Sequence, residues 1–335
     1  PLTAKDLRQH GSTFLAERVV GAYNKDHPDE FKVESVSLDD IAMPKGMPDD
    51  VRTEFRKSIK EREAAFARKT NTLPKYMNGV PPYMFKVKEG STPPRPVKQP
   101  RFGPEKSKLI SRWVEWALTN GLIEPANTAS YASRLILCPK YKYDTPKSSP
   151  PDGIRVAWAG VEINETLQKT VPRYPDAWNQ IYKVASMKYK FTADGLKQYW
   201  TIPLAEEAKE MTAFWTPNGL FQFTRMVMGT KNAATVAQNA YLSAMHTKLN
   251  PRSLPKIALY ADDFMGGADT YLGEGGLLQT FEDFLDMCIE AGITLNPKKV
   301  RVGFVAETWF GLNIEEGRIS HADKNLDPVR KMVYG

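Results

Sequence analysis

The sequence is poor in the residues and runs that build disulfide-linked, zinc-binding or membrane-spanning proteins. It holds two cysteines, Cys138 and Cys288, which lie far apart and form no CxxC pair, so neither a disulfide framework nor a zinc site is indicated. No stretch approaches the roughly 18 consecutive apolar residues of a membrane span, and the N-terminus lacks the shape of a signal peptide. These absences predict a protein of a reducing, intracellular compartment that does not enter a membrane.

Histidine is also scarce, and the common kind of phosphate-binding loop is missing. The four histidines, His10, His27, His246 and His321, are scattered and form no pattern of a general base or a metal site. The chain has neither a glycine-rich phosphate loop nor an internal repeat. Histidine-based catalysis, nucleotide binding through a glycine-rich loop and repeat architectures are therefore not indicated.

Composition and charge are those of a mildly basic globular protein. Hydrophobic residues make up 41% of the 335 residues and charged ones 25%, and the length allows one large or two modest domains. The net charge of +7 suits a polyanionic partner, although many proteins without a nucleic-acid role are equally basic. Because the chain begins at Pro1 and stops at Gly335 just after an apparent helix start, we expect a piece of a longer protein.

The pattern of apolar residues predicts alternating helices and strands. Residues 1–81 are polar with an exposed helix in 49–69, and the proline-rich stretch 80–104 predicts an extended linker. Helices are predicted at 104–120, before 187, at 231–248 and at 277–291; strands are predicted at 133–139, 153–158, 189–193, around 260–263 and as a pair between 300 and 319. The strands 133–139 and 153–158 should form a hairpin. The order of elements predicts an α+β fold with helices packed on one side of a sheet.

Two adjacent carboxylates stand in the middle of an apolar, strand-like run. The run is KIALYADDFMGGA, residues 256–268, and the acids are Asp262 and Asp263. An ionised carboxylate in such a place costs several kcal/mol unless a cation or hydrogen bonds compensate it. Mg²⁺ held by one or two carboxylates and substrate phosphates is a recurrent solution. The alternative is a hairpin turn whose acids point to water, and this motif alone does not decide between the two.

A third acid follows another short apolar strand. Asp194 lies in FTADGLKQYWTI, residues 191–202, and on its own is best explained as a helix N-cap. Two-metal phosphoryl chemistry needs carboxylates from at least two strands, so that ions about 3.5–4 Å apart can be held. Asp194 and Asp262 meet this requirement if their two strands lie side by side.

The order of these motifs resembles the reverse transcriptases of gypsy-type LTR retrotransposons and, more distantly, those of retroviruses. The resemblance runs from about residue 82 to 330 through the segments 122–140, 191–238, 260–263, 292–300 and 308–320. Each segment alone is weak, but five in the right order are specific. The resemblance implies an RNA-directed DNA polymerase, part of a retrotransposon Pol polyprotein, that extends a primer annealed to an RNA or DNA template with dNTPs.

The resemblance also implies roles for individual residues. Asp194, Asp262 and Asp263 would be the catalytic carboxylates, holding two Mg²⁺ ions (or Mn²⁺) together with the Gly195 carbonyl. The residues implied to bind substrate are Tyr199 as the gate against the ribose 2′-hydroxyl, Met228 and Gly229 at the nucleotide, Lys140 and Arg155 at the triphosphate, Lys299 at the pyrophosphate, and Trp309, Phe310 and Gly311 as a primer grip. For several of them there is a plainer alternative: a core aromatic for Tyr199, Trp309 and Phe310, a solvated surface pair for Lys140 and Arg155, and Lys298 in place of Lys299.

The implied fold is the right-hand polymerase fold, α+β with a ferredoxin-like palm sheet. The domain boundaries it suggests are an N-terminal region and linker at 1–81, fingers and palm at 82–318, and the start of a thumb at 319–335. Within the middle domain, fingers would span 98–168 and 203–231, and palm 169–202 and 232–318. The expected location is the cytoplasm, in a retrotransposon particle, with a nuclear stage also allowed. The oligomeric state is left open.

The chain departs from the family in the fingers and near the nucleotide site. AWAGVEIN, residues 157–164, lacks an acid and an arginine that the family has, Gln198 replaces a small residue, and Val227 and Ala234 replace prolines. These changes motivate one rival, a catalytically inactive, domesticated remnant that binds nucleic acid. A second rival is an RNA-dependent RNA polymerase with the same palm, against which Tyr199 argues. No protease string, RNase H acids or integrase acids accompany these motifs.

Overall fold

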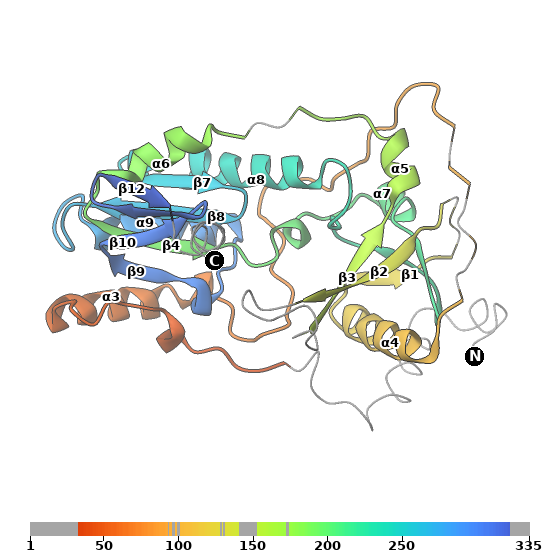
Figure 1. Cartoon of the computed structure of the whole chain (residues 1–335), viewed down its shortest axis with the longest axis horizontal. Coiled ribbons are helices and arrows are strands. Elements are labelled where there is room, and N and C mark those ends of the chain that lie inside the picture. Colours follow the sequence, from red (N-terminus) through yellow and green to blue (C-terminus); the bar gives the residue numbers. More distant parts are fainter. Residues whose placement is uncertain are drawn as a thin grey trace, which may run out of the picture.

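The computed structural model describes residues 33–140, 153–171 and 174–321, apart from residues 93, 96, 97, 99, 100, 128 and 130. Two lobes lie side by side (Figure 1), one built on a four-stranded sheet and the other on two smaller sheets. We call them palm and fingers. The hairpin tip 141–152, the N-terminal residues 1–32 and most of the predicted thumb lie outside the described residues. No described helix is long and apolar enough to cross a bilayer.

The palm sheet is antiparallel, in the order β7-β8-β4-β9. Its strands are β4 (Tyr189–Asp194), β7 (Ile257–Tyr260), β8 (Asp263–Ala268) and β9 (Arg301–Phe304). β4 lies between β8 and β9, and its pairing with β8 runs from Tyr189 opposite Ala268 to Asp194 opposite Asp263. The last residue of β4 and the first of β8 therefore share one end of the sheet.

Both faces of this sheet are covered. On one face Phe191 and Phe264 pack on α8 (Ala233–Lys248) and α9 (Leu277–Ala291) in the main core. On the other face Ala258 and Met265 pack on α6 (Ala177–Ala185) and on a small sheet of β10 (Ala306–Trp309), β11 (Leu312–Glu315) and β12 (Arg318–His321). The prediction that helices lie on one side only is wrong, because the apolar run 257–259 is buried in both directions.

Helix α9 illustrates why these segments are helical. Leu277, Phe281, Phe284 and Cys288 recur at helical spacing and are all fully buried under the sheet. The helix ends at Gly292, whose φ of 75° is the left-handed conformation that glycine adopts without strain. Burial of each such apolar side chain contributes about 1.5–3 kcal/mol. The predicted helix 277–291 is confirmed, whereas the predicted strand pair after residue 300 is four short strands.

The fingers consist of a hairpin, a three-stranded sheet and helices around them. The hairpin joins β2 (Arg134–Lys140) to β3 (Gly153–Ala159), as the sequence predicts, and the sheet has the order β1-β6-β5. The remaining fingers elements are β1 (Ile123–Pro125), β5 (Phe214–Thr216), β6 (Gly219–Phe223), α4 (Pro104–Thr119), α5 (Val161–Thr166) and α7 (Glu206–Glu210). Trp113 of α4 packs against Phe214 and Phe223 and fixes that helix on the sheet.

The segment before residue 82 is part of the palm core. Helix α3 (Asp49–Glu61) buries Val51, Phe55 and Ile59 against the palm, and Arg62 just after it binds Asp286 of α9 at 2.8 Å. The helix is therefore exposed on one face only, and it ends at Glu61 rather than near residue 69. The domain boundary at 81/82 stays a prediction. Short 3-10 turns at Leu38–Asp40, Glu63–Ala65, Leu254–Lys256 and Pro297–Lys299 complete the palm lobe.

Candidate active site

Three carboxylates meet at one end of the palm sheet. Tyr260 pairs with Asp263, so that β7 and β8 are joined by a two-residue turn, Ala261–Asp262. Asp194, at the end of β4, lies directly opposite Asp263. The strands of Asp194 and Asp262 are therefore neighbours, which is the arrangement that the two-metal interpretation required.

The turn that carries Asp262 has an unusual backbone. Ala261 has a φ of 55°, the left-handed region that costs a non-glycine residue about 1–3 kcal/mol. Its N–H donates to Gln238 Oε1 on α8, and its carbonyl accepts from Gln198 Nε2 at 2.8 Å. The carbonyl of Asp262 accepts from the Gly195 N–H at 2.9 Å. These contacts fix the turn against β4 and α8.

The carboxylates repel one another. Loss of solvation, and then the negative charges of Asp262 and Asp194, raise the pKa of the Asp263 carboxyl to about 6. Burial also raises the pKa of Asp194, an effect that the ammonium of Lys299 opposes and the charge of Asp262 reinforces. Negative charge is thus concentrated at this end of the sheet beyond what the protein itself compensates.

Lys299 is the cation nearest to these acids in the described part of the chain. Its Nζ donates to Asp194 Oδ2 at 2.7 Å from the 3-10 turn Pro297–Lys299. Of the two adjacent lysines that the sequence left open, it is therefore Lys299 that contacts a carboxylate. The Lys299 side chain is 56% exposed, so its ammonium reaches Asp194 from the solvent side rather than from within the sheet.

A cleft of about 690 Å³ joins the acids to the hairpin of β10 and β11. Its lining includes Asp194, Asp263, Lys299, Trp309, Phe310 and Gly311. Six of the residues singled out in the sequence therefore face one space, which we call the carboxylate cleft. No other observation gathers as many of them.

The three predicted primer-grip residues all line the cleft, but Trp309 and Phe310 are buried to different degrees. Trp309 is buried in the small core beside α6, as the plainer alternative expected. Phe310, in the turn after β10, is 39% exposed and packs edge-on against Tyr260 at 4.7 Å. Tyr260 in turn lies 5.4 Å from Tyr174, so an aromatic row leads from the cleft past the Ala261–Asp262 turn.

Tyr199 lies beside the same turn. It is half-buried in the 3-10 segment Gln198–Thr201 that follows β4, and its ring packs on the main core. Burial, and then the negative charge of Asp262, raise the pKa of its hydroxyl. Its ring is thus at once part of the core and close to the catalytic turn, so the two interpretations of Tyr199 are compatible.

Met228 and Gly229 lie farther toward the fingers. Gly229 has a φ of 107°, and its carbonyl accepts from Asn164 Nδ2 of α5 at 2.7 Å. A side chain on Gly229 would meet the Trp158 carbonyl at 2.7 Å, so only glycine fits there. Met228 is 43% exposed. These contacts tie the turn to the altered fingers segment 157–164.

Lys140 and Arg155 lie on the fingers hairpin. Lys140 pairs with Gly153 at the open end of β2, and Arg155 pairs with Cys138. Their side chains lie outside the described part of the structure, and so do the basic residues of the hairpin tip. The predicted triphosphate contacts therefore stay predictions.

The donor set suits a hard divalent cation. Mg²⁺ prefers oxygen ligands and is commonly bound by one or two carboxylates together with substrate phosphates. Asp194, Asp262 and Asp263 supply oxygens whose mutual repulsion a cation would relieve, as Lys299 partly does. Among the residues that the structure describes, no three His, Cys, Asp or Glu side chains form a ready-made metal group. Substrate oxygens would thus have to complete the ligand set.

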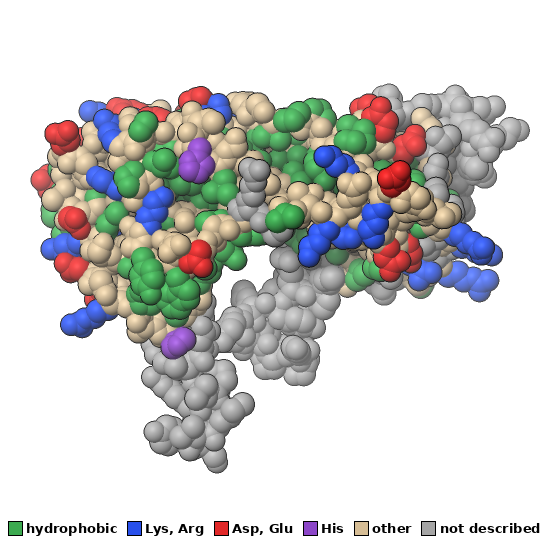
Figure 2. Space-filling view, turned by 90° about the horizontal axis from the view of Figure 1, so that it is seen from above, with side chains coloured by type: hydrophobic (Ala, Val, Ile, Leu, Met, Phe, Trp, Pro, Cys, Tyr) green, Lys and Arg blue, Asp and Glu red, His purple; other side chains and the backbone are tan. Residues whose placement is uncertain are grey.

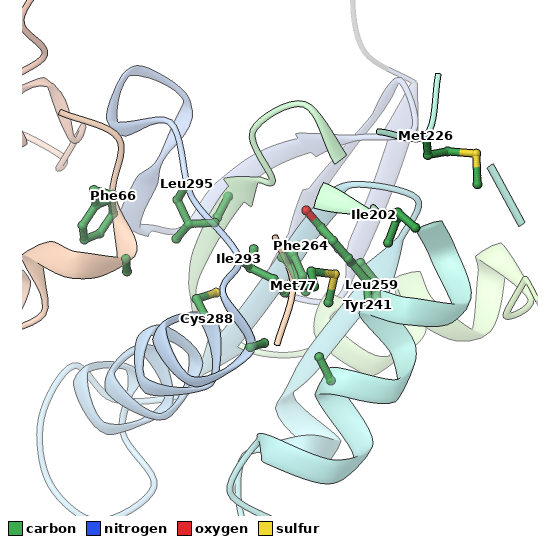
Figure 3. Close-up of a cluster of buried hydrophobic side chains, with 14 of the residues drawn as sticks. Phe66, Met77, Ile202, Met226, Tyr241, Leu259, Phe264, Cys288, Ile293 and Leu295 are labelled. Atoms are coloured by element: carbon green, nitrogen blue, oxygen red, sulfur yellow. The ribbon is translucent and has the colours of Figure 1, made fainter. Parts of the chain in front are cut away.

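Three residues near the site were given no individual role by the sequence. Gln238 and Tyr241 lie on the buried face of α8, and Asn164 holds the turn at Gly229. Figure 3 shows Tyr241 reaching through the buried cluster with its hydroxyl away from α8. That oxygen is buried without a hydrogen-bond partner among the described residues. Helical periodicity places Gln238 and Tyr241 on one apolar face, which was the available signal.

The raised pKa of Asp263, caused first by loss of solvation and then by repulsion from Asp262 and Asp194, predicts how stability depends on pH. Since the folded pKa of Asp263 is about 6 against an ordinary 3.8, the folded state holds this proton more tightly, and stability falls as pH rises from about 4 to about 6. Without metal, Asp263→Asn should therefore raise the melting temperature at pH 7.5 by about 1–3 °C, a small effect because the carboxyl is partly solvated. The gain should vanish near pH 4. A gain of the same size at both pH values would contradict the repulsion.

Known protein families were compared with this chain, and one of them matches the part that carries the three acids. Residues 154–316 match a family described as "Reverse transcriptase (RNA-dependent DNA polymerase)". The Pol polyprotein of transposon 412 from Drosophila melanogaster is 25% identical over 230 residues, which cover 66% of this chain and 17% of that polyprotein. The Pol polyprotein of transposon gypsy from the same fly is 24% identical over 259 residues, covering 76% and 23%. The chain thus spans less than a quarter of these relatives.

Solved structures show the fold. A foamy viral protease-reverse transcriptase in complex with an RNA/DNA hybrid is 17% identical with a TM-score of 0.70, covering 88% of this chain and 36% of that one. The same kind of protein in complex with double-stranded DNA is 16% identical with a TM-score of 0.71, covering 96% and 58%. The right-hand polymerase fold is confirmed, and so is the resemblance to gypsy-type reverse transcriptases.

Proposed function

We propose that this chain, whose residues 154–316 form a reverse transcriptase domain, is an RNA-directed DNA polymerase of a retrotransposon Pol polyprotein. It extends a primer annealed to an RNA or DNA template with dNTPs, inside the cell and in the particle of its element. The observation that carries this proposal is the carboxylate cleft. There Asp194 and Asp263 are paired neighbours on the adjacent strands β4 and β8, and Lys299 and Phe310 line the same cleft. The relatives support the same activity.

The carboxylates would hold two Mg²⁺ ions. Bound there, the ions would make the primer 3′-hydroxyl more acidic and neutralise charge on the triphosphate. Asp194 at the end of β4, Asp262 in the turn and Asp263 at the start of β8 would hold them together with the Gly195 carbonyl. Lys299, already 2.7 Å from Asp194, holds a proton near the departing pyrophosphate.

The other side chains of the site position the nucleic acid. Phe310, which lines the cleft and packs against Tyr260, gives the primer end an apolar surface on which to stack, and Gly311 allows close approach. Phosphates are held by Lys and Arg, including Lys140 and Arg155, so binding should weaken as salt rises. On the face in Figure 2, basic and acidic side chains are interspersed over both lobes, so neither sign of charge dominates that face.

Tyr199 decides between making DNA and making RNA. Its ring, beside Asp262, would collide with a ribose 2′-hydroxyl, so Tyr199→Val should raise ribonucleotide incorporation relative to dNTP incorporation by at least about tenfold. The measurement is single-nucleotide extension on an RNA template with matched dNTP and rNTP. The parent should prefer the dNTP strongly. A parent that uses both equally would favour an RNA polymerase, and an unchanged ratio in the variant would remove Tyr199 from the gate.

The inactive-remnant alternative rests on the altered fingers segment 157–164. In the structure this segment packs closely: Trp158 is buried, and its ring occupies the space where a side chain on Gly160 would lie. Asn164 in turn holds the Gly229 turn. The altered segment therefore takes part in the packing and hydrogen bonding of the fingers, which supports a working lobe.

A further inference from the structure

The position of the Asp262 carboxylate depends on the turn that carries it. Ala261, the residue before it, is in the left-handed conformation, which an alanine keeps only when its surroundings hold it there. The turn has two residues, so a change at Ala261 redirects the side chain of Asp262. What holds Ala261 therefore determines where this acid points.

Two buried carboxamides hold Ala261 from opposite sides. Gln238 on α8 accepts the Ala261 N–H, and Gln198 Nε2 donates to the Ala261 carbonyl at 2.8 Å. Both glutamines are almost fully buried, at 0% and 4% exposure. The backbone of Gln198 is itself anchored, since its carbonyl accepts from Thr201 Oγ1 at 2.6 Å. The two polar groups of one strained residue are thus both engaged.

Gln198 also lies in a particular place along the chain. It comes shortly after Asp194, the last residue of β4, and directly precedes Tyr199 in the same 3-10 segment. The amide of Gln198 therefore connects the segment that carries Asp194 and Tyr199 to the turn that carries Asp262. A small residue at this position, as in the resembling family, could not reach the turn.

We propose that Gln198 is a positioning residue, whose amide fixes the Ala261–Asp262 turn relative to Asp194 and Tyr199. It acts through the Ala261 carbonyl and does not itself touch substrate. The proposal rests on the proposed polymerase function for its effect on rate, but not for the contact. The alternative is that Gln198 only satisfies a buried carbonyl and contributes to stability alone.

The test compares Gln198→Met with Gln168→Met. Methionine keeps the length of glutamine but cannot donate a hydrogen bond. Gln168 is a matched control, because its Nε2 also donates to a backbone carbonyl, that of Val87 at 3.1 Å. This glutamine is exposed, and its partner lies in the proline-rich stretch 80–104 rather than in the Ala261–Asp262 turn. Single-turnover dNTP incorporation is measured with saturating primer–template and Mg²⁺, together with primer–template Kd, melting temperature and amide hydrogen exchange of residues 257–268.

Loss of one buried hydrogen bond predicts a maximal rate about tenfold lower in Gln198→Met. Primer–template Kd should change by less than about twofold, and amide exchange in 257–268 should be faster. Gln168→Met should match the parent in all of these. An unchanged rate, or a rate loss that is recovered when the assay is run well below the melting temperature of the variant, would overturn the proposal.

Failure of the polymerase function gives a different result. If the parent extends no primer, the proposed function fails by itself, and the exchange measurement still decides whether Gln198 holds the turn. Faster exchange in Gln198→Met with Gln168→Met unchanged would support the contact. Equal exchange in all three proteins would overturn it.

Discussion

Asp262→Asn is expected to abolish primer extension, with a rate at least about a thousandfold below that of the parent. Asparagine keeps the shape of the side chain and leaves the backbone bond from Gly195 to the Asp262 carbonyl in place. It removes the negative charge that would hold a divalent cation, which is worth several kcal/mol in the transition state. Single-turnover incorporation of one dNTP on an RNA template measures this loss.

The matched control is Asp286→Asn on the outer face of α9. Asp286 forms an exposed ion pair with Arg62, and such pairs contribute at most about 1 kcal/mol. This variant should extend primers like the parent. Asp262→Asn should also bind primer–template as tightly as the parent, because phosphates are held elsewhere. Weakened primer–template binding together with the lost rate would assign Asp262 to nucleic-acid binding instead.

Gly195→Ala is expected to lower both stability and rate, although it adds only one methyl group. A Cβ at this position would lie 2.6 Å from Tyr241 Oη and 2.8 Å from its ring, closer than real contacts allow. Tyr241 cannot move aside, because it is fully buried and stacked 5.7 Å from Phe264. The end of β4 must shift instead, and Asp194 moves with it. We expect a loss of about 1–3 kcal/mol in stability and at least about tenfold in rate.

A second substitution can test this steric explanation. Tyr241→Leu removes the atoms that the new methyl group meets, so the double variant Gly195→Ala/Tyr241→Leu should extend primers faster than Gly195→Ala alone. Gly46→Ala serves as the control, since nothing lies within 4 Å of its added Cβ. No recovery in the double variant would show that Gly195 is required for another reason, such as its backbone conformation.

The sequence identified the strands that carry the three acids well because their signals are local. Adjacent acids in an apolar run, and a helix ended by Gly292, depend on neighbours in the chain. The pairing of β4 with β8 was different: only the order of motifs in a resembling family suggested it. Without the resemblance, the local sequence would have left Asp194 explained as a helix N-cap.

The misses depend on tertiary contacts. The apolar run 257–259 has no polar alternation, which indicates burial on both faces, yet we predicted helices on one side. Trp309 and Phe310 are adjacent aromatics, and only the position of α6 decides which of them is buried. Gln238 lies on an apolar helix face, but its partner is more than 20 residues away in a turn. Such pairs cannot be read from one sequence.

The measurement that tests the central claim most directly is single-turnover extension of a labelled primer on an RNA template. The unaltered chain is mixed with dNTPs and Mg²⁺, with and without a chelator, after primer–template binding has been measured under the same salt conditions. We predict template-directed addition of dNTPs that stops when the metal is removed. Tight binding of primer–template without any metal-dependent addition would contradict the account and identify the chain as a binding remnant.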